Sequence, residues 1–300
     1  MPLQSWLPVL RDARAQGYGV GLFDTHTVEG AVAIVEAAVE QRSPVIIAPL
    51  GPTRVQQGAF IRALAADADV PIALHLDHGR NFELVMQCIR GGYTDVMLDA
   101  SVEPYDVNLA RTRQVVEAAL PIGVGVESEL GHVGQGVNYD DEASRKALFT
   151  KADDAERFVN ETGCDILAVA IGSAHGVYKG KPELDFERLE EISTRIPHPL
   201  VLHGGSGIAP EDFQKAISLG ISKINIYTGM AQAALGAMRE SVSADDASWM
   251  GVQREVQAAV KDVVATHMQI FGSAGKADRF GASGDTDASI LLSKPGDPEE

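Results

Sequence analysis

Eight short apolar runs, separated by longer amphipathic segments, constrain the fold of this 300-residue chain more than any other feature. The runs span residues 18–23, 44–48, 71–76, 94–99, 121–127, 165–170, 199–203 and 223–227. Segments with helical periodicity stand between several of them, at residues 29–41, 81–92, 105–120 and 209–220. Strands that are apolar throughout are buried on both faces, as in a parallel sheet covered by helices. The alternation predicts an α/β protein, either a (β/α)8 barrel or a doubly wound open sheet.

The polar residues that follow these runs distinguish the two architectures. They stand at or just beyond the C-terminal ends of different predicted strands: Asp24, Asp77, His78, Asp99, Glu129, His175, His203 and Asn225. In a closed barrel all eight strand ends meet around one mouth, whereas an open sheet spreads them along a wide edge. We therefore predict a TIM (β/α)8 barrel with its functional site at the mouth. The barrel is expected as a single domain over residues 1–277, followed by a polar tail at 278–300.

The charge of the chain limits its partners. With 25 Lys and Arg against 42 Asp and Glu, the formal net charge is -17. Nucleic acid and anionic membranes are bound through clustered Lys and Arg, so neither is an expected partner. The sequence has no signal-peptide pattern and no run of about 18 apolar residues, which predicts a cytoplasmic protein. An anionic substrate must then be held by local groups such as backbone amides, a lysine or a metal ion.

Three histidines follow three separate strands of the predicted barrel. His78, His175 and His203 would meet at the mouth, and converging neutral imidazoles form a natural zinc site with an open fourth position. A single histidine at a strand end more often caps a turn or packs in the core, but three at one level favour a metal site. Asp99 and Glu129 end the fourth and fifth strands and can offer oxygen ligands to a second or displaced metal position.

The stretch "HLDH" places two histidines around an aspartate at the end of the third strand. His75 lies two residues before Asp77, so the pleat directs both to the same side of the strand, while His78 alternates with them. His75 is therefore expected to support the site or to fill the barrel. Asp77 and His78 are adjacent, and we expect a turn at Gly79 to let both side chains reach the mouth.

A glycine-rich turn follows the seventh strand in the stretch "HGGSGIAPEDF", residues 203–213. Glycines let backbone N–H groups approach an anion closely, and a helix begins directly afterwards. Such a turn can also be a plain connection between a strand and a helix. The stretch at 225–228 favours the anion site, because phosphate sites on barrels are commonly built from the loops after strands seven and eight.

Five stretches in combination closely resemble one family of enzymes. They are "PIALHLDHG", "VESELGHVG", "GSAHGVYKGKPELDFERL", "VLHGGSGIAPEDFQKAISLGISKINIYT" and "FGSAGKA". From about Trp6 to Ala277 the chain resembles the class II, zinc-dependent fructose-bisphosphate and tagatose-bisphosphate aldolases. The resemblance implies a TIM barrel and reversible retro-aldol cleavage of a ketose (bis)phosphate, similar to fructose 1,6-bisphosphate, into dihydroxyacetone phosphate and an aldehyde. It also implies a homo-oligomer, either a dimer or a tetramer.

The resemblance carries residue roles onto this chain. It implies a catalytic Zn2+ on the three histidines named above and Asp77 as the acid/base that serves the aldehyde oxygen. Asp99 and Glu129 match the family's second metal position, which leaves open a second divalent or a monovalent cation. The positions that match the family's substrate site are Gly176, Lys179, Gly204, Gly205, Ser206, Asn225, Ile226, Tyr227 and Thr228.

Departures from the family pattern gather on the aldehyde side of the site. Asp24 stands where relatives carry an asparagine-rich segment, and adds a charge to the expected substrate contacts at the mouth. Leu50, also expected to line the substrate site, stands where relatives place a serine. Val137 and Asn138 replace acidic residues of the loop after the fifth strand, and Tyr227 replaces Asp or Asn. The metal and phosphate half is thus expected to be kept, and the aldehyde half to differ.

Two alternatives to a ketose-phosphate aldolase remain open at this point. The same metal and enolate chemistry serves a lyase or an epimerase that acts on another hydroxyketone or hydroxyacid. A catalytically silent, aldolase-like subunit that binds a phosphosugar is the other alternative, and the missing acidic residues of the loop favour it. Asp77 and the three histidines argue against a silent subunit, because such a protein has no need of them.

Overall fold

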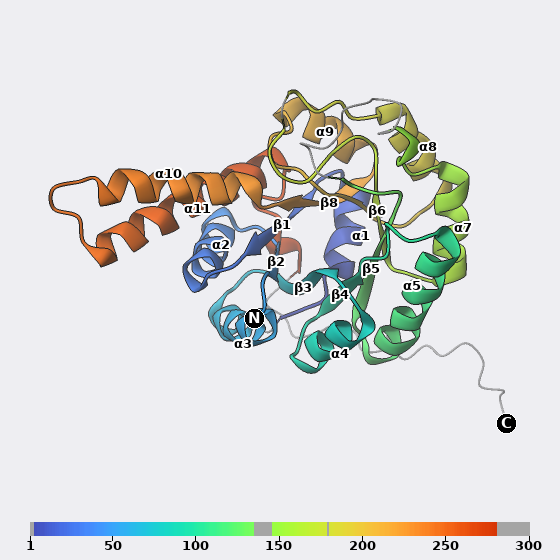
Figure 1. Cartoon of the computed structure of the whole chain (residues 1–300), viewed down its shortest axis with the longest axis horizontal. Coiled ribbons are helices and arrows are strands. Elements are labelled where there is room, and N and C mark those ends of the chain that lie inside the picture. The colour runs from blue at the N-terminus through green and yellow to red at the C-terminus, as the bar shows by residue number, and fades with distance from the viewer. Residues whose placement is uncertain (1–2, 135–145, 179, 281–300) are drawn as a thin grey trace.

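Eight parallel strands close into a barrel in the order of the sequence, with β8 pairing with β1 (Figure 1). The computed structural model describes residues 3–134, 146–178 and 180–280. The strands are β1 (Val20–Thr25), β2 (Val45–Pro49), β3 (Ile72–Gly79), β4 (Asp95–Leu98), β5 (Gly125–Leu130), β6 (Ile166–Val169), β7 (Leu200–Leu202) and β8 (Ile221–Ile226). The prediction of a TIM barrel is confirmed, and an open sheet is excluded.

Helices surround the barrel between successive strands (Figure 1). They are α1 (Trp6–Gln16), α2 (Val28–Gln41), α3 (Arg54–Asp67), α4 (Phe82–Arg90), α5 (Tyr105–Ala119), α7 (Ala152–Thr162), α8 (Phe186–Arg195), α9 (Pro210–Ser218), α10 (Thr228–Val242) and α11 (Trp249–Ile270), with short 3-10 helices at Leu120–Ile122 and Ala277–Phe280. Side chains cap the N-terminal ends of several helices: Thr27 accepts a hydrogen bond from the Gly30 N–H at α2, and Asn81 accepts one from the Leu84 N–H at α4. These caps orient the helices that follow β1 and β3.

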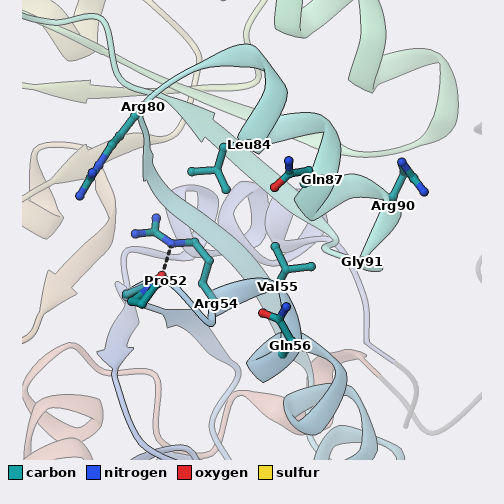
Figure 2. A pocket seen from close by; sticks show the side chains of 10 residues that line it. Pro52, Arg54, Val55, Gln56, Arg80, Leu84, Gln87, Arg90 and Gly91 are labelled. Carbon is teal, nitrogen blue, oxygen red and sulfur yellow. Dashed lines mark hydrogen bonds between the residues drawn. The ribbon is translucent and has the colours of Figure 1, made fainter.

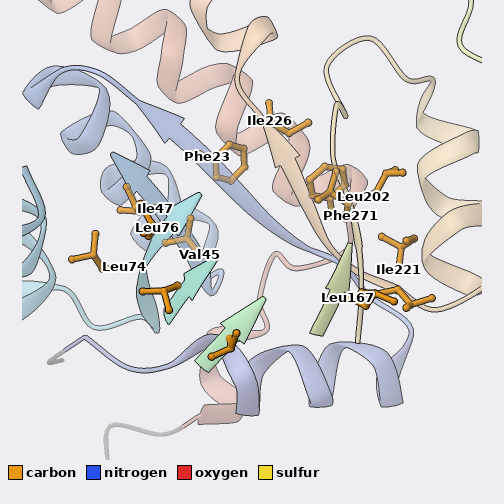
Figure 3. Close-up of a cluster of buried hydrophobic side chains, with 14 of the residues drawn as sticks. Phe23, Val45, Ile47, Leu74, Leu76, Leu167, Leu202, Ile221, Ile226 and Phe271 are labelled. Carbon is orange, nitrogen blue, oxygen red and sulfur yellow. The ribbon is translucent and has the colours of Figure 1, made fainter. Parts of the chain in front are cut away.

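Alternation along the strands divides the apolar residues into two cores. Phe23, Ile47, Leu74 and Leu167 face outward and pack with the surrounding helices (Figure 3). Their neighbours along the chain point into the barrel and form a second cluster, which includes Leu22, Ile46, Ala73, Ile166, Ala168 and Val201. Burial of an aliphatic or aromatic side chain of this size stabilises the fold by about 1.5–3 kcal/mol. The lower barrel is therefore a packed core, and space for a ligand remains only toward the mouth.

Helix α1 closes the end of the barrel at which the strands begin. Trp6 is buried in the inner cluster, and its backbone N–H donates to the carboxylate of Asp95 at the start of β4 (3.0 Å). The same carboxylate accepts from the hydroxyls of Ser5 (2.5 Å) and Thr94 (2.7 Å). A preceding backbone bond from the Gln4 N–H to the Ile72 carbonyl (3.0 Å) joins the segment to β3. Access to the interior is thus possible only from the opposite end.

Helices α10 and α11 form a long antiparallel hairpin that projects from the barrel (Figure 1). The inner part of α11 packs against α2, where Lys261 forms an ion pair with Glu40 (2.8 Å) and Gln253 donates to Glu29 (3.0 Å). The hairpin is therefore anchored to the first helix after β1 and extends beyond the barrel surface. Among the described residues, no helix is long and apolar enough to cross a membrane.

The apolar run at residues 121–127 predicts the fifth strand several residues too early. The strand begins at Gly125, because Leu120–Ile122 form a 3-10 turn that ends at Gly123, whose φ is 76°. The loop after β5, which is long, glycine-rich and acidic in the sequence, lies partly outside the described residues, and the tail from residue 281 lies outside them entirely.

Candidate active site

A pocket of about 170 Å³ opens at the C-terminal ends of the strands. It is lined by Asp24, Leu50, Asp77, His78, His175, Gly176, Gly204, Gly205, Ser206, Asn225, Tyr227 and Thr228. These residues come from the ends of six strands or the loops that follow them, so the barrel brings together groups up to two hundred residues apart in the sequence. Most of the side chains expected at the mouth from the sequence therefore lie in one cavity.

The three histidines form a compact group at this mouth. The ring of His78 lies 4.7 Å from that of His203 and 5.0 Å from that of His175, centroid to centroid. One ring nitrogen of each histidine lies within 4.8 Å of the corresponding atom of the other two. The arrangement has the donor number and type of a zinc site with three imidazole ligands and an open position.

In each of these rings one nitrogen is held by the protein, which orients the other. Asp99 Oδ2 lies 2.7 Å from His78 Nδ1, and the Val133 carbonyl lies 3.1 Å from His175 Nδ1. Glu127 Oε1 lies 2.9 Å from His203 Nε2. Hydrogen bonds of this kind fix the tautomer and direction of metal-binding imidazoles. They leave three nitrogens that face one another: His78 Nε2, His175 Nε2 and His203 Nδ1.

The electrostatic environment of the three histidines differs from ring to ring. Burial, together with the nearby His203 and His78, lowers the pKa of His175 to about 3, so its ring is neutral at physiological pH. Burial also lowers the pKa of His78, but the carboxylates of Asp77 and Asp99 outweigh that effect and raise it to about 10. Negative charge is therefore concentrated around the facing nitrogens. His175 Nε2 is buried and has no hydrogen-bond partner in the described part of the chain.

Asp77 is held at the edge of this group by Asn225. The Asn225 side-chain N–H donates to Asp77 Oδ1 (3.0 Å), and its carbonyl oxygen accepts from Lys223 Nζ (2.8 Å). Burial would raise the pKa of Asp77, but His78, His203 and Lys223 lower it well below its ordinary value. The carboxylate is therefore ionised at neutral pH and can accept a proton from a bound hydroxyl group.

A fully buried lysine, Lys223, connects Asp77 with the histidines and was not predicted from the sequence. Lys223 forms an ion pair with Glu127 (2.8 Å), and Glu127 also binds His203 and lies 3.5 Å from His75 Nε2. Burial raises the pKa of Glu127, but Lys223 and His203 more than compensate and lower it to about 2. The signal for this network was present, because a Lys and a Glu inside strand sequences must find partners when buried.

His75 supports the site from below. Its side chain is fully buried, and its Nδ1 accepts a hydrogen bond from the indole N–H of Trp6 (3.2 Å). Burial lowers the pKa of His75 to about 4, so the ring is neutral. This position agrees with the expected supporting role and links the site to α1.

His78 departs from strand geometry, and the expectation of a turn at Gly79 needs correction. The backbone of His78 has φ 45°, in the left-handed region that few residues other than glycine adopt, and β3 continues to Gly79. The pairing register with β4 shifts between Leu76 and Gly79. The change in direction thus occurs at His78 itself, and it brings His78 and Asp77 to the same mouth.

Glu129 and Asp99 lie beside the histidines. Glu129 Oε2 is buried, 3.3 Å from His203 Nδ1, and has no hydrogen-bond partner among the described residues. Burial raises the pKa of Glu129, whereas hydrogen bonds from His78 and Ser101 lower that of Asp99 in spite of its burial. His78, Asp99 and Glu129 together place three possible ligand atoms within 4.8 Å of one another. In this structure the Asp99 carboxylate orients His78.

The loops after β7 and β8 form a narrow backbone cradle on one side of the pocket. A side chain at Gly205 would lie only 2.9 Å from the Asn225 carbonyl, so glycine is required there. The Tyr178 hydroxyl donates to the Gly204 carbonyl (2.8 Å), and the Ser206 hydroxyl accepts from the Gly229 N–H (3.0 Å). The start of α10 adjoins this turn, and its first residue, Thr228, lines the pocket, so the N-terminal end of a helix lies beside it.

Two residues expected at the substrate site, Ile226 and Lys179, are not among the residues described around the pocket. The side chain of Ile226 is fully buried in the outer core (Figure 3), so only the backbone of this residue can face the pocket. The reason is strand alternation, since Asn225 and Tyr227 on either side of it line the pocket. Lys179 lies outside the described residues, as do Val137 and Asn138 of the loop after β5.

Asp24, Leu50 and Tyr227 form a further part of the pocket lining. The Tyr227 ring packs edge-on against that of His26, with centroids 5.5 Å apart. Burial, together with the carboxylate of Asp77, raises the pKa of Asp24 well above its ordinary value. Asp24 is thus a buried carboxyl group whose ionised form is disfavoured by burial and by the neighbouring Asp77.

Comparison with known proteins agrees with this architecture. The model of the family described as fructose-bisphosphate aldolase class-II matches residues 4–276. The fructose-bisphosphate aldolase of Thermus caldophilus is 42% identical, over 92% of this chain and 100% of the relative. A probable fructose-bisphosphate aldolase of Bacillus subtilis is 41% identical with the same coverage. The crystal structure of the YdjI aldolase from Escherichia coli K12 superposes with a TM-score of 0.83 at 36% identity, over 92% of this chain and 100% of that one.

The closed barrel and these matches define the protein class as a TIM-barrel lyase that cleaves carbon–carbon bonds. More narrowly, the chain belongs to the class II fructose-bisphosphate aldolase family, and it is an aldolase. Aldolases of this class depend on a metal ion, and the described residues contain candidate His, Asp and Glu groups to hold one.

Proposed function

We propose that this aldolase uses Zn2+ held by His78, His175 and His203 to cleave a ketose phosphate into dihydroxyacetone phosphate and an aldehyde. The observation that carries the proposal is that each ring has one nitrogen held by Asp99, Glu127 or a backbone carbonyl, and the other directed at its two neighbours. The buried and unpartnered His175 Nε2 fits this ion, because an imidazole nitrogen in that position requires a ligand.

Zinc bound by these three histidines would supply a Lewis acid for the negative charge that develops on the ketose carbonyl oxygen during C3–C4 cleavage. Asp77 accepts the proton of the C4 hydroxyl during cleavage and returns it to the aldehyde oxygen during condensation. Its depressed pKa keeps it ionised, and Asn225 holds its other oxygen, so one lone pair is directed at the substrate. Glu129 and Asp99 form a second position at which a further divalent or a monovalent cation can bind.

The backbone cradle at Gly204–Ser206, with Gly176 and Thr228, binds the phosphate of the dihydroxyacetone half. N–H groups and a helix start supply the positive potential that the net charge of -17 does not. Fructose 1,6-bisphosphate is the first substrate to test, because relatives that are about 40% identical are named for it. The expected cytoplasmic location stays a prediction.

We infer that the protein functions as a homo-oligomer. One side of α10 presents Leu235, Met238 and Val242, which are 42–57% exposed, at helical spacing. At the start of α11, Trp249 and Met250 are 73% and 72% exposed. Exposed apolar side chains on both helices of a projecting hairpin support association with a second copy, as a dimer or as part of a tetramer.

The decisive experiment measures zinc and activity on the same preparation. We expect stoichiometric zinc by mass spectrometry, retro-aldol cleavage of fructose 1,6-bisphosphate or another ketose phosphate, and loss of both on treatment with a chelator. Restored activity on addition of Zn2+ excludes damage by the chelator. Stoichiometric zinc without cleavage of any phosphorylated ketose contradicts the proposal and favours a silent subunit, whereas interconversion of sugar epimers without cleavage favours an epimerase.

A further inference from the structure

The catalytic pocket contains a buried carboxyl group that the reaction proposed above does not use. Asp24 stands near the end of β1, where Leu22 packs in the inner cluster and Phe23 in the outer core. Strand alternation therefore directs the Asp24 side chain into the barrel, and it lines the pocket together with Asp77 and Tyr227. It is 7% exposed, and its Oδ1 has no hydrogen-bond partner among the described residues. A bound ligand can supply the partner that such a buried oxygen needs.

Asp24 and Asp77 bring two carboxyl groups to one small cavity. Burial and then the charge of Asp77 raise the pKa of Asp24, and burial and then the charge of Asp24 raise the pKa of Tyr227. Asp24 is thus close enough to both neighbours to act on them electrostatically. A carboxyl group accepts hydrogen bonds when it is ionised, and it also donates one when it is protonated. In either state Asp24 can therefore bond a hydroxyl group.

The surroundings of Asp24 disfavour other kinds of partner. A phosphate or carboxylate on the substrate would meet two carboxyl groups there, and like charges repel. The described residues contain three groups of possible metal-ligand atoms, and Asp24 belongs to none of them. An apolar group would leave Oδ1 buried and unpaired, which is costly. A hydroxyl group, the polar group that a ketose carries along its chain, is the partner that fits.

A separate groove of about 730 Å³ lies between α3 and α4 (Figure 2). Arg54 and Arg80 line this groove, and Arg54 Nε donates to the Gly51 carbonyl (2.9 Å). Within the described part of the chain, the groove and the catalytic pocket have no lining residue in common. The substrate atoms next to the bond that breaks are therefore contacted by the lining of the catalytic pocket itself.

The position of Asp24 assigns it to the aldehyde half of the substrate. In the proposed reaction the three histidines and the cradle at Gly204–Ser206 serve the half that becomes dihydroxyacetone phosphate. The part of the lining formed by Asp24, Leu50 and Tyr227 is left for the other half. The Leu50 N–H donates to the Thr25 carbonyl (2.8 Å), which holds the loop after β2 against the end of β1. Asp24 and the apolar Leu50 thus lie together on this part of the lining.

We propose that Asp24 bonds the hydroxyl group on C5 of the ketose phosphate, which is the carbon next to the carbonyl group in the aldehyde product. C5 follows C4, whose hydroxyl group Asp77 serves, so the two carboxyl groups contact consecutive hydroxyl groups. Asp24 is thereby a specificity-determining residue, since an aldehyde without this hydroxyl group leaves Oδ1 unpaired. The inference rests on the aldolase function proposed above.

Aldol condensation with two small aldehydes tests the assignment. Dihydroxyacetone phosphate is combined with glycolaldehyde, which carries the hydroxyl group, or with acetaldehyde, which lacks it. The measured quantity is the ratio of kcat/KM for glycolaldehyde to kcat/KM for acetaldehyde. Asp24→Ala should lower this ratio about tenfold or more, because only glycolaldehyde loses a hydrogen bond to a buried partner. General damage to the site lowers both constants together and leaves the ratio unchanged.

Three further variants separate the hydrogen bond from other effects. Asp24→Leu fills the space without a hydrogen-bonding group and should lower the ratio as Asp24→Ala does, so the test does not depend on the stability of one variant. Asp24→Asn keeps the shape and can still bond a hydroxyl group, so its ratio should stay within about threefold of the wild-type ratio. Asp106→Ala, at an exposed position on α5, is the control and should leave both constants unchanged.

The position of the hydroxyl group is tested with 3-hydroxypropanal, in which it lies one carbon further from the carbonyl group. Asp24→Ala should change kcat/KM for this aldehyde no more than it does for acetaldehyde, and a loss as large as for glycolaldehyde would overturn the assignment to C5. An unchanged ratio of glycolaldehyde to acetaldehyde in Asp24→Ala and Asp24→Leu would overturn the role of Asp24 and leave the aldolase function intact. Failure of the wild-type protein to condense any aldehyde would overturn the aldolase function, and the role of Asp24 with it.

Discussion

Asp77 owes its position to a chain of buried side chains that also holds the histidines. Asn225 binds it directly, Lys223 binds Asn225, and Glu127 joins Lys223 to His203. The proposed proton carrier and the proposed metal ligands are therefore connected through three hydrogen-bonded residues. Because every member is buried, each bond is stronger than it would be in water and costly to leave unmade.

Substitutions at two adjacent residues should separate proton transfer from metal binding. Asp77→Asn keeps the shape and the contact with Asn225 but cannot accept a proton, so we expect full zinc content and a fall in kcat of about 100-fold to 10,000-fold. His78→Ala should lose both zinc and activity. Zinc by mass spectrometry and cleavage by a coupled assay measure the two effects. Zinc loss in Asp77→Asn would show that this carboxylate acts as a metal ligand instead.

Lys223→Met should destabilise the fold strongly. The change leaves the Glu127 carboxylate buried without its cation, which typically costs about 3–5 kcal/mol. The double variant Lys223→Met with Glu127→Gln removes both charges, so its free energy of unfolding should fall less than that of the single variant. Urea denaturation gives the free energy of unfolding, and Lys151→Met, at an exposed position before α7, is the control. A single variant as stable as the control would mean that the ion pair does not stabilise the barrel.

At the scale of elements, the site depends on where β3 stops being a regular strand. The left-handed backbone of His78 turns its ring toward His175 and His203, while Asp77 keeps the direction set by the strand. Regular alternation would send one of the two away from the mouth. The bulge against β4 is thus the local feature that allows two adjacent residues to serve one site.

The strands were predictable from the sequence because each signal is local. Apolar runs of four to eight residues with polar ends identify buried strands, and polar residues at those ends identify the mouth. The backbone of His78 was not predictable, since nothing in "LDHGR" marks a left-handed histidine. Nor was the role of Lys223 predicted, because its partner Glu127 is 96 residues away and only the closed barrel brings them together.

The contact between α1 and β4 should make stability depend on pH. Burial raises the pKa of Asp95 to about 7 from 3.8, although three donors favour the carboxylate. The protonated Asp95 carboxyl group therefore makes its full contribution to the free energy of unfolding below about pH 4. This contribution is lost as the pH rises through 7, by up to about 4 kcal/mol. Asp95→Asn, which stays neutral and can donate to Ser5, should lose this dependence.

Urea denaturation of wild type and Asp95→Asn between pH 4 and 8 measures the difference, with the exposed Asp106→Asn as the control. We expect the wild-type free energy of unfolding to fall relative to Asp95→Asn as the pH rises. A constant difference across this range would mean that Asp95 is ionised throughout and that the donors outweigh burial.

At the scale of the whole molecule, the hairpin of α10 and α11 carries apolar surface that the barrel does not cover. Trp249→Ser combined with Met250→Ser should shift the proposed oligomer toward monomer, because a tryptophan buries about 150–250 Å² at an interface. Light scattering after size-exclusion chromatography over a range of concentrations measures the mass. Asp245→Ser with Asp246→Ser, at the exposed tip of the same hairpin, is the matched control. A wild-type protein that is monomeric at every concentration would contradict the homo-oligomer.

The placement of Arg54 and Arg80 has a consequence for how such enzymes diverge during evolution. Both residues stand outside the strand pairing of the barrel, and neither contacts the residues that hold the histidines. Exchanges at exposed loop positions usually change stability by less than about 0.5 kcal/mol. Selection can therefore exchange such loop residues one at a time, while the costly arrangement of Lys223, Glu127 and His78 stays intact. The barrel separates the buried network, which its strands hold constant, from loop positions that are free to change.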